Sequence, residues 1–254
     1  MLSRLNQVNV FIGTLTLSLI EIYTVLTKDR LVIKRIFVST FLDNLRKIAW
    51  SCLPISLLTV STSAIVYSFH IAPEFYTRGL SVYLGGIVAL ALIREGAPVM
   101  GALAIIMQYC SGMTAQIASM KVTEQLDAMK LAKANPAIYL LLPMICSGII
   151  GFPLVIVICI LVSILVNYLT SNLLINITYQ VYTTSISNAV VIKDLILVLV
   201  KSSIFGFVST LVSFTCGILT VGGSKSVGNA TRLSVIINFA LVVILDYIIT
   251  ALWL

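Results

Sequence analysis

Four charged residues lie within long apolar stretches of the sequence, and they are the first candidates for chemistry. Arg94 and Glu95 are neighbours, whereas Lys201 and Asp246 each stand alone in a separate stretch. If these stretches cross a membrane, a charge at mid-depth costs roughly 2.5–3.5 kcal/mol on insertion scales and must face protein or water. Two interpretations follow: a proton or ion relay through all four residues, or structural contacts that hold helices together.

The spacing of these residues favours particular contacts. On a helix, the side chains of Arg94 and Glu95 project about 100° apart and need not pair with each other. Pro98 lacks the N–H group that would bond to the Arg94 carbonyl, so a backbone acceptor is freed beside both charges. Lys201 and Asp246 each lie about eight residues inside the same end of their stretches, roughly 12 Å deep. Equal depth predicts a Lys201–Asp246 ion pair, which we expect to be structural.

Groups that usually catalyse reactions or bind metals are scarce. His70 is the single histidine, and the five cysteines include no CxxC spacing, so no credible metal-binding set exists. Gly217 and Gly222 have P-loop spacing, but Gly223 stands where the lysine belongs and no strand precedes them. No Ser/Lys, Asp/Asp or His-based motif supports an intramembrane enzyme. The sequence therefore predicts no catalytic residue and no cofactor, and any ATP must be bound by another chain.

Residues 120–130 form the most polar segment between two apolar stretches. The segment contains neither Gly nor Pro, and Val122, Leu126 and Met129 would share one face of a helix. Glu124, Gln125 and Asp127 lie largely off that face, which predicts a short amphipathic helix. Periodicity alone leaves two interpretations: a solvated connector, or a helix that docks in a partner's groove and transmits movement.

The composition identifies the elements that must position these residues. The chain has 254 residues, 59% hydrophobic and 10% charged, against roughly 45–50% and about 25% in soluble domains. The chain is therefore predicted to be an all-α integral membrane protein, and its long apolar stretches each suffice to cross about 30 Å of hydrocarbon. We predict five transmembrane helices at about 48–70, 80–117, 136–166, 191–219 and 231–253. The neutral polar residues after Val166 are predicted to form an extramembrane loop.

The positive charges give the orientation. Five crossings place twelve of the sixteen Lys and Arg residues on one face, two on the other and two within spans. By the positive-inside rule, the face with twelve cations is cytoplasmic. The net charge of +7 is thus explained by membrane orientation and requires no nucleic-acid partner.

The first 47 residues are predicted to be an interfacial, cytoplasmic helical segment. The stretch 5–27 is apolar, lacks a small-residue cleavage site and is followed by basic residues, which argues against a signal peptide. A helix in the cytoplasmic interface is favoured over a sixth crossing. Residues 1–254 are then one membrane-embedded domain, with 48–254 as its five-helix core.

Several sequence stretches point to one protein family. They are Gly85–Glu95 running into Pro98-Val99, Met120–Asp127, Asn135-Pro136, Gly228–Arg232 and Leu245–Leu252. In these stretches, from about Phe41 to the C-terminus, the chain resembles the MlaE/YrbE family of permeases. Members of this family are the membrane subunits of ABC-type lipid transporters that work with MCE-domain proteins.

The resemblance implies a homodimeric phospholipid permease of the bacterial inner membrane, with the plastid inner envelope as the alternative. It implies a coupling helix at about 120–131 that contacts a separate cytoplasmic ABC ATPase. It also implies a lipid cavity near the start of span two. The implied coupling residues are Lys121, Val122, Thr123, Glu124, Gln125, Asp127 and Met129, and the implied cavity residues are Leu80, Tyr83, Arg94, Glu95 and Pro98.

The chain also departs from the family pattern. Gln108 and Gln116 stand where the family usually has an arginine and a glutamate, so both signs of charge are lost together. The substitutions bear on the transport rate and on the preferred lipid. The rival function is an ion-coupled secondary transporter that uses Arg94, Glu95, Lys201 and Asp246, although five spans without a visible internal repeat argue against it.

Overall fold

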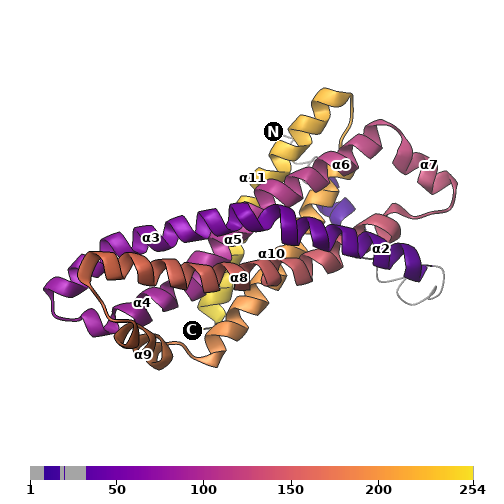
Figure 1. Ribbon diagram of the computed structural model, residues 1–254. Coiled ribbons are helices and arrows are strands. Elements are labelled where there is room, and N and C mark those ends of the chain that lie inside the picture. Colours follow the sequence, from indigo (N-terminus) through magenta and orange to yellow (C-terminus); the bar gives the residue numbers. More distant parts are fainter. Residues whose placement is uncertain (1–8, 18–19, 21–32, 254) are drawn as a thin grey trace. The chain divides into compact units, whose positions relative to one another are not determined.

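The computed structural model describes residues 9–17, 20 and 33–253. The described residues are predominantly helical and include no strand (Figure 1). Five helical stretches among them are long and apolar enough to cross a membrane. These are Phe37–Thr77, Ser81–Val122, Ala137–Ile175, Ile192–Ile218 and Ser224–Trp253. The prediction of an all-α membrane protein with five spans is confirmed.

Several spans consist of successive helical segments. Span one joins α2 (Ile33–Arg46), a π-helical turn η1 (Lys47–Cys52) and α3 (Leu53–Thr77). Span two joins a 3₁₀ turn η2 (Ser81–Tyr83), α4 (Leu84–Ala91), the π turn η3 (Leu92–Gly96), α5 (Ala97–Ile105), the π turn η4 (Ile106–Cys110) and α6 (Ser111–Val122). The short helix α7 (Gln125–Leu131) follows. Span three joins the π turn η5 (Ala137–Leu141) and α8 (Leu142–Ile175), and α9 (Tyr179–Ala189), α10 (Ile192–Ile218) and α11 (Ser224–Trp253) complete the chain.

Prolines explain three of the four π turns found among the described residues. Pro54, Pro98 and Pro143 each lie at the start of the α-helix that follows such a turn. A proline cannot donate to the carbonyl four residues before it, and its ring crowds that carbonyl. The preceding turn widens as a result, and the helix continues without a break in the span.

The prediction of a loop after Val166 is wrong. Helix α8 continues to Ile175, and α9 follows after three residues. Asn167 is buried, and its side chain donates to Ser68 Oγ at 2.6 Å and accepts from the Tyr182 hydroxyl at 2.6 Å. These contacts satisfy polar groups that local sequence reasoning assigns to water.

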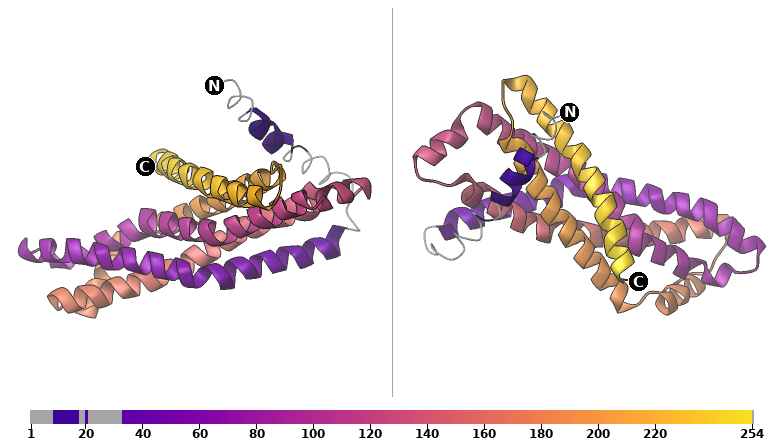
Figure 2. Two further views of the ribbon diagram at one scale, coloured as in Figure 1. Left: turned by 90° about the horizontal axis from the view of Figure 1, so that it is seen from above. Right: turned by 180° about the vertical axis from the view of Figure 1, so that it is seen from behind.

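The N-terminal prediction is only partly covered by the described residues. Residues 9–17 are helical (indigo in Figure 2), and the rest of the stretch 5–27 lies outside the described residues, apart from residue 20. An interfacial position for this helix stays a prediction. Residues 37–46, which the sequence assigns to the same segment, belong to the helix that continues into span one.

The chain divides into two compact units. One contains residues 1–48, 106–151 and 206–241, and the other contains 49–105, 152–205 and 242–254. In the first unit, a buried polar network joins α6, α10 and α11. The Ser234 hydroxyl lies 2.9 Å from Thr114 Oγ1 and donates to Ser213 Oγ at 3.1 Å, and Asn238 Nδ2 donates to Ser213 Oγ at 2.9 Å. This network fixes three helices to one another within that unit.

In the second unit, glycines allow α4 and α9 to pack side by side (Figure 1). The Gly86 N–H donates to Ser185 Oγ at 2.9 Å. A Cβ atom on Gly86 would lie 2.7 Å from both Ala189 Cβ and the Ser185 carbonyl oxygen. A Cβ on Gly85 would lie 2.7 Å from the Tyr182 carbonyl oxygen. Only glycine fits here, because backbone atoms cannot move aside as flexible side chains do.

We expect Gly86→Ala to destabilise the protein although alanine is the better helix former. Overpacking at such a contact costs typically about 1–3 kcal/mol. Gly112→Ala is the matched control, since a Cβ there meets nothing within 4 Å and should stabilise the helix by roughly 0.5–1 kcal/mol. Thermal unfolding in detergent would compare the two variants. Equal shifts in melting temperature would contradict the close packing of α4 against α9.

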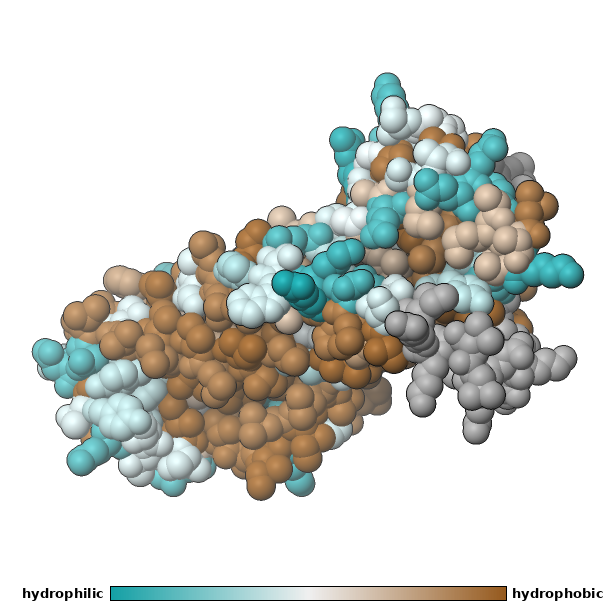
Figure 3. All heavy atoms as spheres, turned by 45° about the vertical axis from the view of Figure 1, so that its right-hand side comes forward, coloured by the Kyte–Doolittle hydropathy of each residue, from teal (hydrophilic) through white to brown (hydrophobic). Residues whose placement is uncertain are grey.

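Large apolar side chains cover much of the outer surface (brown in Figure 3). Exposed examples lie on α3, α8 and α11, among them Leu58, Leu161 and Ile236. A water-soluble monomer rarely exposes so much contiguous apolar surface. This surface is consistent with helices that face lipid along their length.

Candidate functional site

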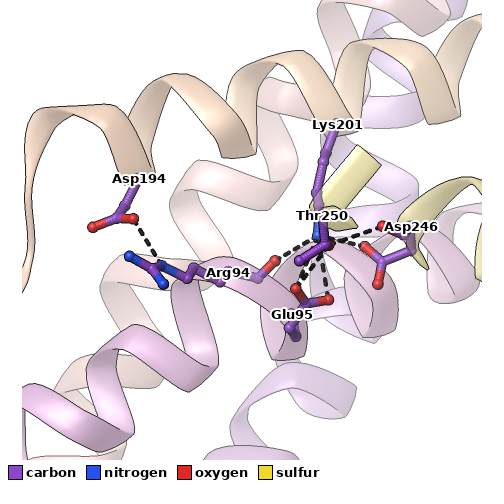
Figure 4. Close-up of polar contacts among 6 residues, drawn as sticks. All are labelled: Arg94, Glu95, Asp194, Lys201, Asp246 and Thr250. Atoms are coloured by element: carbon purple, nitrogen blue, oxygen red, sulfur yellow. Dashed lines mark hydrogen bonds and ion pairs between the residues drawn. The ribbon is translucent and has the colours of Figure 1, made fainter. Parts of the chain in front are cut away.

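The buried ammonium group of Lys201 is the centre of a polar cluster (Figure 4). Its side chain is fully buried in α10, and Nζ lies 2.7 Å from Asp246 Oδ1 of α11. Nζ also lies 3.2 Å from each carboxylate oxygen of Glu95. The Thr250 hydroxyl, one turn from Asp246, donates to Glu95 Oε1 at 2.9 Å. One cation thus holds together spans two, four and five.

The π turn η3 contributes a backbone acceptor to this cluster. Lys201 Nζ donates to the Arg94 carbonyl oxygen at 2.9 Å. Four residues after Arg94 stands Pro98, which has no N–H to offer that oxygen. An unpaired buried carbonyl costs roughly 1–3 kcal/mol. The lysine therefore satisfies a group that the proline leaves without its helical partner.

Arg94 turns away from Glu95 and pairs with Asp194 of α10 (Figure 4). Its Nε donates to Asp194 Oδ1 at 2.8 Å, and the Asp194 side chain is only 4% exposed. The second carboxylate oxygen of Asp194 accepts the Val191 N–H at 3.0 Å. Asp194 thus caps the start of α10 and binds Arg94 at the same time.

We name the six residues of Figure 4 the charged cluster: Arg94, Glu95, Asp194, Lys201, Asp246 and Thr250. The Lys201–Asp246 contact is the one that equal depth predicts, while its role in stability stays a prediction. Sequence reasoning missed Asp194 and Thr250. Helical spacing offered a signal, since Asp194 precedes Lys201 by seven residues and Thr250 follows Asp246 by four, which places each on the face of its neighbour.

The predicted lipid-cavity residues are not all in one place. Arg94 and Glu95 belong to the charged cluster, and Pro98 is buried. Tyr83 is exposed and lines a separate pocket of about 430 Å³ formed by η2 and α4 with α9. Leu80 is exposed just before η2 and does not line that pocket. A common lipid cavity formed by all five residues stays a prediction.

The polar segment after Met120 contains two helical pieces separated by a turn. Helix α6 ends at Val122, and Glu124 adopts a left-handed conformation with φ of 61° before α7 begins. The prediction of one helix with Val122, Leu126 and Met129 on a single face is therefore wrong, because Val122 belongs to α6 and the other two residues belong to α7. Leu126 is buried, whereas Thr123, Glu124 and Gln125 are exposed at the turn.

An ion pair closes this turn. Lys121 Nζ lies 2.9 Å and 3.1 Å from the two carboxylate oxygens of Asp127. Left-handed backbone costs a non-glycine residue roughly 1–2 kcal/mol, and such outliers gather at functional positions. The exposed side chains are thus presented on a turn that the Lys121–Asp127 ion pair spans.

We expect α7 to become less ordered at low pH, because protonation of the Asp127 carboxylate removes its ion pair with Lys121. The hydrogen bond from Lys121 lowers the pKa of the Asp127 carboxyl below its ordinary value of 3.8. A depressed pKa in the folded state gives stability that is present above the ordinary pKa and lost as the pH falls through the lower one. Hydrogen–deuterium exchange of residues 123–131 should be steady at neutral pH and accelerate only below the ordinary pKa. Asp127→Asn should abolish that acid dependence, and an unchanged profile in this variant would contradict the assignment.

Comparisons with known proteins agree with this architecture. The model of the family described as Permease MlaE matches residues 41–252. A probable ABC transporter permease protein, ycf63, of Pyropia yezoensis is 33% identical over 78% of this chain and 75% of its own length. A probable ABC transporter permease protein of Rickettsia typhi is 30% identical over 85% and 84%. The chloroplastic protein TRIGALACTOSYLDIACYLGLYCEROL 1 of Arabidopsis thaliana is 27% identical over 83% of this chain and 60% of its own length. With five membrane-spanning helices and a family match over most of its length, this chain belongs to the MlaE permease family.

Proposed function

We propose that this chain is the membrane permease subunit of an ABC transporter that moves phospholipid or a related lipid. Its curated relatives in Pyropia and Rickettsia are named as ABC transporter permeases, and the Arabidopsis relative carries the name of a glycerolipid. In this proposal a separate cytoplasmic ATPase supplies the energy, and the chain itself carries out no reaction.

The turn between α6 and α7 is the observation that carries the proposal. Glu124 and Gln125 are exposed on the face that the positive charges assign to the cytoplasm. The buried side chain of Leu126 packs α7 against the rest of its unit. Glu124 and Asp127 would contact basic groups of the ATPase, and Met129 would add apolar contact. Closure of two ATPase subunits would push α7, which follows directly from span two.

The substrate side of the proposal involves two copies of the chain. A homodimer would enclose an outward-facing lipid cavity around Arg94, Glu95, Pro98, Leu80 and Tyr83. An MCE-domain protein on that side would exchange lipid with the cavity. The bacterial inner membrane is the proposed location, with the plastid inner envelope as the alternative.

Reconstitution tests this function. The chain would be placed in vesicles with an ABC ATPase and an MCE-domain protein from the same organism, and the transfer of a fluorescent phospholipid between vesicle and MCE domain would be measured. We expect transfer to require both ATP and the ATPase. Transfer by the chain alone, driven by an ion gradient, would contradict the proposal and support the secondary transporter, for which the charged cluster would serve as the relay.

A further inference from the structure

A second pocket lies beside α7, within the unit that contains residues 106–151. Its volume is about 560 Å³, within the range of about 300–1,000 Å³ typical of ligand sites. Three lysines line it, Lys121, Lys130 and Lys133, and the described part of the chain contributes no acidic residue to its lining. Leu17, Leu126 and Ile218 contribute apolar wall. The pocket thus combines a cationic rim with a hydrophobic wall.

Two of the lysines are available for a ligand. Lys121 is held by Asp127, whereas Lys130 and Lys133 are exposed and have no ion-pair partner in the described part of the chain. Lys133 itself adopts a left-handed conformation with φ of 58°, which ends α7. The pocket also includes Pro136 and Ala137, at the N-terminal end of the 39-residue third span. The positive end of that helix dipole adds to the field of the lysines.

The helix ends around the pocket place it on the side of the membrane that the positive charges assign to the cytoplasm. Helix α6 ends at Val122, span three begins at Ala137 and α10 ends at Ile218, all on the face that carries twelve cations. Leu131, between the two available lysines, is 87% exposed. An exposed apolar side chain flanked by cations is typical of segments that contact an anionic lipid surface.

We propose that this pocket binds the phosphate group of an anionic phospholipid from the cytoplasmic leaflet. Lys130 and Lys133 donate to the phosphate oxygens, and the acyl chains follow the wall formed by Leu17 and Ile218. The site is separate from the proposed transport cavity. Because its lining joins residues 14 and 17, the end of α7 and the end of α10, a bound lipid would hold α7 against the spans that it must move.

Native mass spectrometry of the intact permease tests the site. Protein carried in detergent would be exposed to phosphatidylglycerol or to phosphatidylcholine, which has a phosphate but no net charge. Each lysine near an anionic surface contributes roughly a factor of five in affinity. We therefore expect Lys130→Gln with Lys133→Gln to lower the retention of phosphatidylglycerol more than about tenfold. Lys130→Arg with Lys133→Arg should retain it.

The matched control removes two cations from the same membrane face but outside the pocket. Lys225 and Arg232 are exposed near the start of α11, and their replacement by glutamine changes the net charge equally. Equal loss of lipid in the control and in the pocket variant would overturn the proposal. Competition by inorganic phosphate as effective as that by phosphatidylglycerol would overturn the lipid assignment, since a soluble anion would then account for the site.

Discussion

Replacing Lys201 with methionine is expected to destabilise the protein by about 3–5 kcal/mol. The lysine side chain is fully buried, and its removal leaves Asp246, Glu95 and the Arg94 carbonyl without their common donor. An uncompensated buried charge costs more than the ion pair itself contributes. The folded fraction after detergent extraction, measured by size-exclusion chromatography and thermal unfolding, reports the loss.

Neutralising the two carboxylate partners of Lys201 should restore the stability of Lys201→Met to different extents. The Asp246 side chain is 13% exposed and that of Glu95 is 43% exposed. The orphaned Asp246 carboxylate is the more deeply buried of the two and therefore the more costly, so Asp246→Asn should restore more stability to Lys201→Met than Glu95→Gln does. Lys193→Met is the control, because Lys193 is exposed on the same helix. A Lys201→Met single variant as stable as its double with Asp246→Asn would disprove a structural role for the pair.

Reversing the charge of Glu124 is expected to disconnect the permease from its ATPase. Glu124→Lys places a cation where the proposed function requires an anion, and loss of a charge pair in an interface commonly costs enough to lower affinity at least about tenfold. The side chain is exposed, so the variant should insert and fold normally. Co-purification of the ATPase with the tagged permease measures the effect.

Two further variants separate charge from backbone in this test. Glu124→Asn removes the charge but tolerates the left-handed conformation at φ of 61°, so a partial loss of the complex would identify the charge as the cause. Lys225→Glu reverses an exposed charge on the same membrane face and should leave the complex intact. A stable complex with Glu124→Lys would contradict the docking role of this turn.

The spans were predictable because hydropathy and length alone decide which helices cross a bilayer. The freed carbonyl of Arg94 was predictable too, since it follows from the covalent structure of Pro98. Depth along a helix suggested the partner of Lys201. Each of these inferences uses one helix at a time.

Two features that sequence reasoning missed depend on specific contacts, one between distant segments and one across six residues. Helix α9 has neutral polar residues typical of a loop, and it is held by packing against Gly85 and Gly86 of α4. The break at Glu124 follows a helix-favouring sequence and is accompanied by the Lys121–Asp127 contact. Neither arrangement has a local periodic signature.

The π turns of span two have a consequence for movement. In lipid, each backbone amide must keep a hydrogen-bond partner at all times. In η3 the Ala97 N–H bonds to the carbonyl of Leu92, five residues earlier, where a regular helix would use the fourth. An amide can exchange one of these acceptors for the other without losing its bond. In the proposed function, span two would twist stepwise by such partner exchange, and a push from the ATPase would reach Arg94 and Glu95 without exposing bare backbone to hydrocarbon.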